Sequence, residues 1–397
     1  MYKKIWIVTQ EKALLVLPYG FLFFLFLMFA APTSKIANQA FYLFVLLPSV
    51  LSTRLLKGEA LYTTLKPIVY LVVFWALFSF VGFDSGGWEN VAKRFRHAFY
   101  VAAFIGTAYY LLSVGFISVE KLMIALFCLA AAYSLLSFVD FYWLHERSLG
   151  ARLFPVLRLN SPIFMGIILT VYGVVLMKWF LGKGEALNVL VIFLIIIFFL
   201  YFYNSRSAVV GLFVGVLGMT IYKQKEGQKL FSIGILILFI AFLVGGYYFG
   251  NILNRGVSYR FDIWISSLMK IVDCGLFLGC GFGGNSEITI ESGQTFQHSH
   301  NIFLSHFLNT GLFGLLSLLC VVGYITYKGF KRNAIMVLGL LVGMAALMFD
   351  GNALLTNPDD IWLIFWLPLI MTYWEINQKK HQDIVAIRDS VKKEFKS

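Results

Sequence analysis

The sequence predicts an all-α polytopic membrane protein, and its composition is the first reason. Of the 397 residues, 60% are hydrophobic and only 13% are charged, and the mean hydropathy is +0.81. These values lie far outside the range of soluble domains. The second reason is that apolar runs recur along the whole chain. The third is that the longest polar stretch, near residues 250–300, is too short to build a sizeable core of its own.

About twelve apolar runs have a length suited to a membrane-spanning helix. In order they cover residues 14–30, 36–52, 65–83, 97–117, 122–144, 163–181, 187–203, 207–222, 229–249, 301–327, 333–355 and 360–376. We therefore expect one transmembrane domain over residues 1–377, with residues 250–300 as one large loop carrying short helices. A polar, cytoplasmic tail is expected over residues 378–397. The first run lacks a small-residue cleavage pattern and is expected to be retained, with a signal peptide as the alternative.

Lysines and arginines separate to opposite sides of the predicted membrane. Most lysines fall in loops on the side of the N-terminus, which the positive-inside rule makes cytoplasmic. The net charge of +12 therefore does not predict a nucleic-acid partner. Arginines gather in the outer loops, where a planar guanidinium can bind phosphate with two parallel hydrogen bonds. The outer arginines are Arg94, Arg96, Arg147, Arg152, Arg158, Arg206, Arg255 and Arg260. For some of them, contact with lipid head groups or capping of helix ends is the alternative.

Two of these arginines are the strongest phosphate-binding candidates. Arg206 lies in a very short polar break between two apolar runs, where a charge is costly unless it is used or paired. Arg260 opens an amphipathic segment with Trp264 and Leu268 on its apolar side, as expected for a helix at the membrane interface. A local pair of Arg260 with Asp262 is unfavourable, because residues two apart on a helix do not face each other.

A lone imidazole stands where the large loop enters the next apolar run. His300-Asn301 is followed, after nine residues, by Gly311-Leu312-Phe313-Gly314. At the first turn of a helix the macrodipole disfavours imidazolium, so His300 is expected to stay neutral and able to accept a proton. Gly311 lies about three turns after His300. We expect Gly311 and Gly314 on nearly the same helix face, open to a lipid chain or to another helix, although simple helix packing would also explain them.

Other candidate residues carry weaker signals. Asp350 falls within the run 333–355, and a carboxylate inside a membrane is a functional candidate. His298 and His300 could chelate a metal, but the nearby acids do not supply evident further ligands, so no metal site is expected.

The cysteines fall into two pairs with different expectations. Cys128 and Cys320 are expected as buried thiols. Cys274 and Cys280 flank a glycine-rich apolar turn, which we expect to pack closely against neighbouring helices; they are either free thiols or, in an outer loop, a disulfide.

The motif His300-Asn301-x9-Gly311-x-x-Gly314, in a chain of about twelve spans with a large loop before it, resembles the O-antigen ligases of Gram-negative bacteria. The resemblance implies a GT-C type fold and transfer of O-antigen polysaccharide from undecaprenyl pyrophosphate to lipid A-core oligosaccharide. It places the active site at the periplasmic face of the inner membrane, among membrane lipids, with inversion and without a metal or other cofactor. By resemblance, His300 is the catalytic histidine and Arg206 and Arg260 bind the pyrophosphate. Asn301, Gly311, Gly314 and Asp350 are further substrate-binding candidates.

Two other functions remain open from the sequence. An O-antigen polymerase of the same superfamily would use the same donor with a lipid-linked acceptor, and the form of the motif favours the ligase. A transporter or flippase of lipid-linked sugars would require charges inside the spans and an internal repeat. Apart from Asp350, the charges singled out as functional candidates lie at the outer face.

Overall fold

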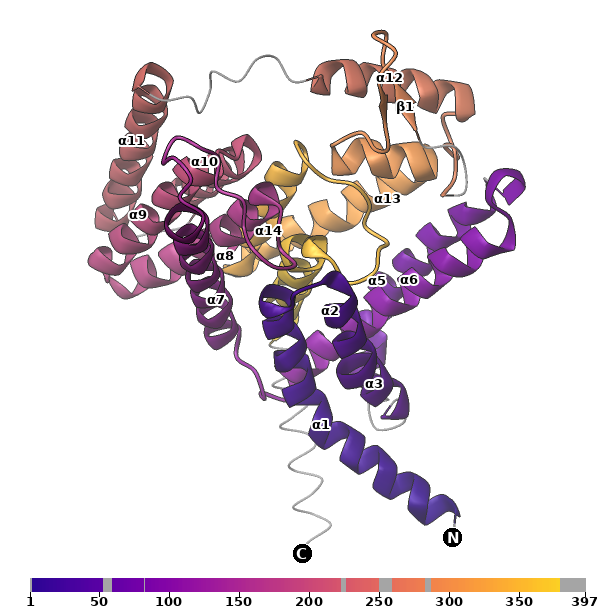
Figure 1. Ribbon diagram of the computed structural model, residues 1–397. Coiled ribbons are helices and arrows are strands. Elements are labelled where there is room, and N and C mark those ends of the chain that lie inside the picture. Colours follow the sequence, from indigo (N-terminus) through magenta and orange to yellow (C-terminus); the bar gives the residue numbers. More distant parts are fainter. Residues whose placement is uncertain are drawn as a thin grey trace, which may run out of the picture.

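The protein is a bundle of helices with one short hairpin, as seen in a computed structural model that describes residues 2–52, 59–81, 83–222, 226–249, 259–282 and 287–378 (Figure 1). Within these residues, six helical stretches are long and apolar enough to cross a membrane: Ser34–Leu51, Val119–Leu144, Pro162–Lys183, Ala186–Tyr203, Glu226–Val244 and Ile302–Arg332. Shorter apolar helices cover Leu15–Ala30, Thr64–Phe80, Arg206–Ile221 and Met336–Leu347. The all-α membrane class is confirmed, and the count of twelve spans stays a prediction.

The helices follow the apolar runs of the sequence, because a helix satisfies its backbone polar groups internally where water is absent. They are α1 (Tyr2–Ala30), α2 (Ser34–Phe41), α3 (Leu47–Leu51), α5 (Glu59–Leu77), α6 (Phe83–Ser113), α7 (Val119–Val139), α8 (Pro162–Lys183), α9 (Ala186–Tyr203), α10 (Arg206–Ile221), α11 (Glu226–Phe249), α12 (Arg260–Cys274), α13 (Ile302–Arg332) and α14 (Met336–Leu347). Short π or 3-10 turns adjoin them: η1 (Tyr42–Leu46), η2 (Phe78–Phe80), η3 (Asp140–Leu144) and η4 (Trp362–Trp366). Residues 367–378 continue from η4 as a helix.

Helix α8 lies at the centre and packs against α7, α9, α10 and α14. Glycines allow the close approach: a Cβ at Gly215 of α10 would lie 2.7 Å from Val342 of α14. On the same two helices Gly211 faces Ala346 and Gly218 faces Leu338, so α10 and α14 run antiparallel. The start of α10, the end of α14 and the start of α13 therefore share one end of the bundle, which we call the loop end.

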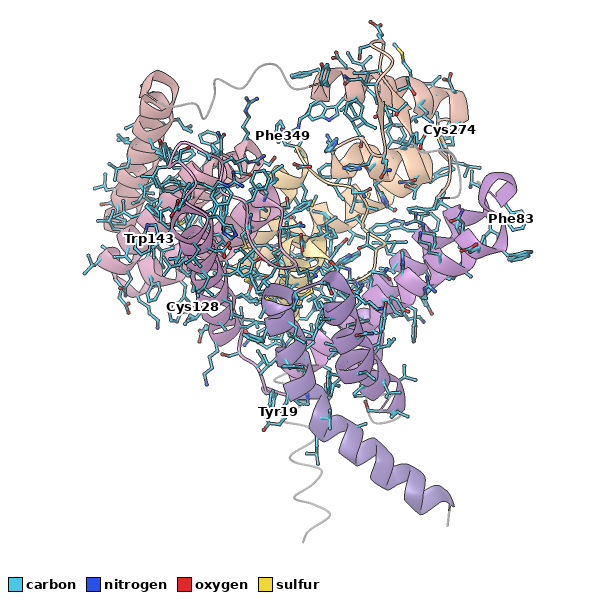
Figure 2. All side chains as sticks on the ribbon, in the orientation of Figure 1. Tyr19, Phe83, Cys128, Trp143, Cys274 and Phe349 are labelled. Carbon is cyan, nitrogen blue, oxygen red and sulfur yellow. A yellow bond between two sulfur atoms is a disulfide. The ribbon has the colours of Figure 1, made fainter. Side chains whose placement is uncertain are left out.

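The described part of the large loop folds over this end of the bundle. Helix α12 lies crosswise to α11 and over the first part of α13 (Figure 1). Strands β1 (Ile288–Thr289) and β2 (Thr295–Phe296) pair antiparallel, with Ile288 opposite Phe296. In Figure 2, Phe349 and Cys274 mark the loop end, far from Tyr19. The expected helical content of the loop is found in α12, whereas the hairpin was not predicted. Residues 250–258, with Arg255, and the tail over 379–397 lie outside the described residues.

Three expectations are wrong in detail. The run 301–327 is not one straight helix, because Gly311 adopts φ 60° and ψ −166°. The run 333–355 ends as a helix at Leu347, and residues 348–359 are non-helical. The sequence Asp350-Gly351-Asn352 explains this, since all three residue types favour turns. Cys128 and Cys320 are exposed on their helices rather than buried, on surfaces that would face lipid.

Candidate functional site

His300 sits in a strained backbone position just before α13. Its φ is 50°, in the left-handed region that few residues other than glycine adopt. Asn301 follows as the N-cap: its side-chain oxygen accepts from the backbone N–H groups of Phe303 at 2.9 Å and Leu304 at 3.1 Å. The imidazole is thus two residues before the first helical turn rather than within it. The Asn301 amide oxygen is engaged in capping, which gives this residue a positioning role.

A single carboxylate joins His300 to Arg260. Asp350 Oδ1 lies 3.2 Å from His300 Nδ1, and Asp350 Oδ2 lies 3.4 Å from a terminal nitrogen of Arg260. Asp350 is buried, with 8% of its surface exposed, whereas the His300 side chain is 32% exposed. The sequence candidates His300, Arg260 and Asp350, which are far apart in the chain, therefore form one cluster. Arg260 pairs with Asp350 and not with its neighbour Asp262.

The segment after α14 is fixed so that Asp350 reaches this position. Gly351 packs so tightly against the start of α13 that a Cβ there would lie 2.7 Å from the Ile302 Cβ. Farther along, the Leu355 carbonyl accepts from Arg94 at 3.3 Å and lies 3.2 Å from His97 Nδ1. Asp350 is therefore not an intramembrane carboxylate within a helix, as the sequence suggested, but part of a non-helical segment with partners.

Helix α12 presents Arg260 because its buried face is anchored. Ile263, Ser267 and Ile271, at intervals of four residues, form that face. Ile263 and Ile271 share a small core with Cys280, Ile288, Ile290 and Leu308, contributed by the glycine-rich turn, the hairpin and α13. Trp264, expected on the apolar side, packs its ring 5.9 Å from Phe349, next to Asp350. Ring contact thus ties α12 to the segment that carries the carboxylate.

His298 is closer to the site than the sequence indicated. Its ring centroid lies 4.2 Å from that of His300. Burial lowers the pKa of His298, and His300 acts in the same direction while Asp350 opposes it. The His-x-His spacing was visible in the sequence, but a strained loop was needed to bring the two tilted rings together. Among the described residues, no three His, Cys, Asp or Glu side chains are grouped as metal ligands would be.

Arg206 reaches the loop end from a different helix. It is the first residue of α10, after Asn204 in the left-handed region and Ser205, whose hydroxyl caps the helix by accepting from Ala208 N–H. The short polar break predicted between two apolar runs is thereby found. Since α10 is antiparallel to α14, Arg206 lies toward the end of the bundle at which Asp350 follows α14.

The two motif glycines do not form an open face under His300. A Cβ at Gly311 would lie 2.2 Å from the Phe277 carbonyl oxygen, so this kink is filled by the glycine-rich turn. At Gly314 a Cβ would lie 1.9 Å from Thr310 Oγ1. Because the kink rotates the helix after Gly311, the expectation that both glycines continue the His300 face is wrong. The close packing expected of the glycine-rich turn is confirmed.

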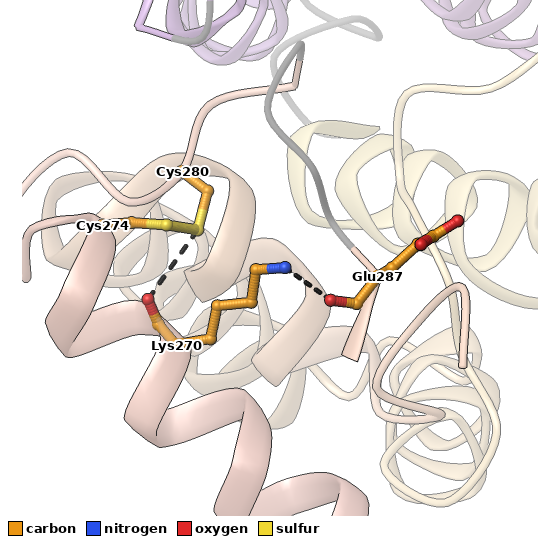
Figure 3. The surroundings of a disulfide bond; sticks show 4 residues. All are labelled: Lys270, Cys274, Cys280 and Glu287. Carbon is orange, nitrogen blue, oxygen red and sulfur yellow. Dashed lines mark hydrogen bonds between the residues drawn. A yellow bond between two sulfur atoms is a disulfide. The ribbon is translucent and has the colours of Figure 1, made fainter. Parts of the chain in front are cut away.

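Cys274 and Cys280 form a disulfide that closes this turn (Figure 3). The sequence left the disulfide as one of two alternatives. In the structure the glycines favour it, since Gly275 and Gly279 both adopt positive φ and bring the two Cα atoms to 4.8 Å. Lys270 donates beside it to the Glu287 carbonyl, which ties α12 to the start of the hairpin (Figure 3).

His306 does not belong to the cluster around Asp350. It is buried, and its ring packs 4.5 Å from that of Trp75.

A comparison with known proteins gives a match that includes part of this site. Residues 191–319 match the family described as O-Antigen ligase. An O-antigen ligase of Pseudomonas aeruginosa is 28% identical over 177 residues, an alignment that covers 43% of this chain and 43% of the relative. The similarity thus spans less than half of that relative's length. The family segment contains Arg206, Arg260 and His300 and ends before Asp350. Over residues 191–319, the chain is therefore similar to the O-antigen ligase family.

Proposed function

We propose that this protein transfers O-antigen polysaccharide from undecaprenyl pyrophosphate to a sugar hydroxyl of lipid A-core, at the periplasmic face of the bacterial inner membrane. The reaction inverts the anomeric carbon and uses neither metal nor cofactor. The family match and the name of the relative support the class of reaction. The contact between His300 and Asp350 is the observation that supports the chemistry.

His300 is proposed as the general base. An ionised carboxylate can only accept hydrogen bonds, so the imidazole nitrogen facing Asp350 carries the proton and Nε2 is left as the acceptor. Nε2 takes the proton from the acceptor sugar hydroxyl while that oxygen attacks the anomeric carbon of the donor. The bond from the anomeric carbon to the pyrophosphate oxygen breaks, and undecaprenyl pyrophosphate leaves with the electron pair. A base of this kind contributes about 10²–10⁴-fold.

Arg260 and Arg206 are proposed to hold the departing pyrophosphate. Arg260 shares Asp350 with His300, so its guanidinium stands next to the base. Arg206 begins α10, where free backbone N–H groups also favour an anion. Each positioned donor that meets charge developing in the transition state contributes about 3 kcal/mol.

Two structural features support the periplasmic orientation and weigh against a transporter. The Cys274–Cys280 disulfide is expected in an oxidising compartment such as the periplasm. Asp350, the intramembrane carboxylate that the sequence singled out as a functional candidate, lies in a non-helical segment at the loop end. A transport pathway would need charges deeper in the bundle.

The test is the lipopolysaccharide of a strain from which this gene is deleted. A ligase predicts lipid A-core without O-antigen and full-length polymer retained on undecaprenyl pyrophosphate. A polymerase predicts lipid A-core that carries single repeat units, and this result would overturn the proposal. Complementation with the wild-type chain should restore capped lipid A-core, and complementation with His300→Ala should not.

A further inference from the structure

Helix α12 has a buried face, a polar face and an exposed apolar face. A helix on the surface of a soluble protein usually has only a buried apolar face and an exposed polar face. The buried face, Ile263, Ser267 and Ile271, packs on the small core of the large loop. A polar face borders a groove of about 540 Å³ and includes Ser266, Lys270 and Asp273. The third face is apolar and exposed, at intervals of three or four residues: Phe261 66%, Ile265 53%, Leu268 46% and Val272 67%.

The exposed apolar face continues into the disulfide-closed turn. Leu276, Phe277 and Leu278 directly follow α12 and are 45%, 57% and 48% exposed. Three consecutive exposed apolar side chains at the tip of a closed loop require an apolar partner.

The turn is attached to a membrane-spanning helix. Leu312 N–H donates to the Leu276 carbonyl at 2.9 Å, and Cys280 N–H donates to the Leu308 carbonyl at 2.7 Å. The Phe277 ring lies 5.8 Å from that of Phe313, which is itself half exposed on α13. Because α13 is long and apolar enough to span the bilayer, Phe277 packs beside an exposed face of a helix that could itself meet lipid.

Several backbone polar groups of the turn are hydrogen-bonded within the protein, which favours entry into a bilayer. Irregular backbone is tolerated at membrane depth only where its polar groups are satisfied by protein. The Gly279 N–H donates to the Gly275 carbonyl at 2.8 Å, and the Phe277 carbonyl accepts from Phe313 N–H at 3.4 Å. Together with the bonds to α13 just named, these bonds satisfy the carbonyls of Gly275, Leu276 and Phe277, while the three apolar side chains of the turn are exposed.

We propose that the turn over residues 275–279 inserts its apolar tip into the acyl region of the bilayer leaflet at the loop end, and that α12 lies along the surface of that leaflet on its Ile265 face. The occupant of this surface is phospholipid. The proposal does not depend on the catalytic assignment. Together with the proposed role of Arg260 in binding pyrophosphate, the insertion would hold the Arg260 side chain at the lipid surface.

Photo-cross-linking of the full-length protein in phosphatidylcholine vesicles tests the insertion. The phenylalanine derivative p-benzoylphenylalanine replaces Phe277 in one variant and Ile265 in another. The matched control carries it at Ser266, one residue from Ile265 but on the polar face. After irradiation, mass spectrometry of the peptides measures lipid adducts, and the intact Cys274–Cys280 disulfide in unreduced peptides verifies that each variant is folded. If a variant loses the disulfide, Leu276 or Leu278 replaces Phe277 as the labelled position.

Lipid adducts at Phe277 and Ile265, several-fold more abundant than at Ser266, are expected. Equal yields at Ile265 and Ser266, or no lipid adduct in the turn, would overturn the proposal. Cross-links from position 277 to a second copy of the chain would also overturn it, because they would assign this surface to self-association.

Discussion

Asp350 Oδ1 lies 3.2 Å from His300 Nδ1 while its other oxygen lies 3.4 Å from the Arg260 guanidinium. One buried carboxylate thus connects the entrance of α13, the start of α12 and the segment after α14. The same contact fixes which imidazole nitrogen can accept a proton. It also means that a change at Asp350 acts on the base and on the phosphate-binding arginine together.

Replacing Asp350 by Asn should lower the rate of transfer by about 10²-fold or more, because an amide no longer enforces the Nδ1–H tautomer of His300. Binding of the lipid-linked donor should change much less. The measurement is steady-state transfer by purified protein, with kcat and KM determined separately and thermal unfolding as a check of folding. Asp262→Asn, two residues from Arg260 and without a contact to His300, is the matched control. Full kcat in the Asp350 variant would remove this residue from the mechanism.

Arg206→Lys and Arg260→Lys should each lose most activity although the charge is kept. An ammonium cannot reproduce the planar fork that binds a pyrophosphate with two parallel hydrogen bonds. Transfer assays with a purified lipid-linked donor measure the effect, and Arg147→Lys in an outer loop serves as the control. Normal rates for both Lys variants would show that the two arginines act only through long-range charge or structure.

Stability should fall in mild acid through His298. Burial and the nearby His300 lower the pKa of His298 below its ordinary value of about 6.5. The folded state therefore favours the neutral ring, and the stability that it contributes is present above about pH 6.5 and is lost as pH falls below that value. In thermal unfolding scans, His298→Asn should show a smaller decrease in Tm than wild type between about pH 7.5 and about pH 5.5. An equal decrease would contradict this linkage.

Orientation and metal independence can be measured on the same protein. After mild reduction, Cys274 or Cys280 should react with a membrane-impermeant thiol reagent added from the periplasmic side. Activity should persist in excess EDTA, because two arginines supply the charge neutralisation that a metal would otherwise give. Variants with Ser at Cys128 and Cys320 remove the other two thiols and serve as the background. Labelling only in inverted vesicles would contradict the periplasmic orientation. Activity that EDTA abolishes and magnesium restores would contradict metal independence.

The sequence predicted features set by local chemistry and missed those set by tertiary contact. Long apolar runs identified the helices, and the residue types of His300, Arg206, Arg260 and Asp350 identified candidates for the chemistry. Periodicity placed Gly311 on a straight helix. The kink at Gly311 could not be predicted in this way, because it is filled by the Phe277 backbone, which lies more than thirty residues away in the sequence. The place of Asp350 was missed for a similar reason. Its apolar surroundings read as a span, whereas Asp350-Gly351-Asn352 gave a turn signal that could have ended the helix earlier.

Single-turnover transfer by His300→Ala decides whether His300 acts in the chemical step. The donor is preloaded on purified protein, and the acceptor is then added in excess. If His300 is the general base, the variant should bind donor about as well as wild type, remain folded and transfer at a rate lower by about 10²–10⁴-fold. His306→Ala is the control, because it removes a buried histidine ring that packs against Trp75 and has only a structural role in this mechanism. Transfer at the wild-type rate by folded His300→Ala protein would contradict the general-base mechanism.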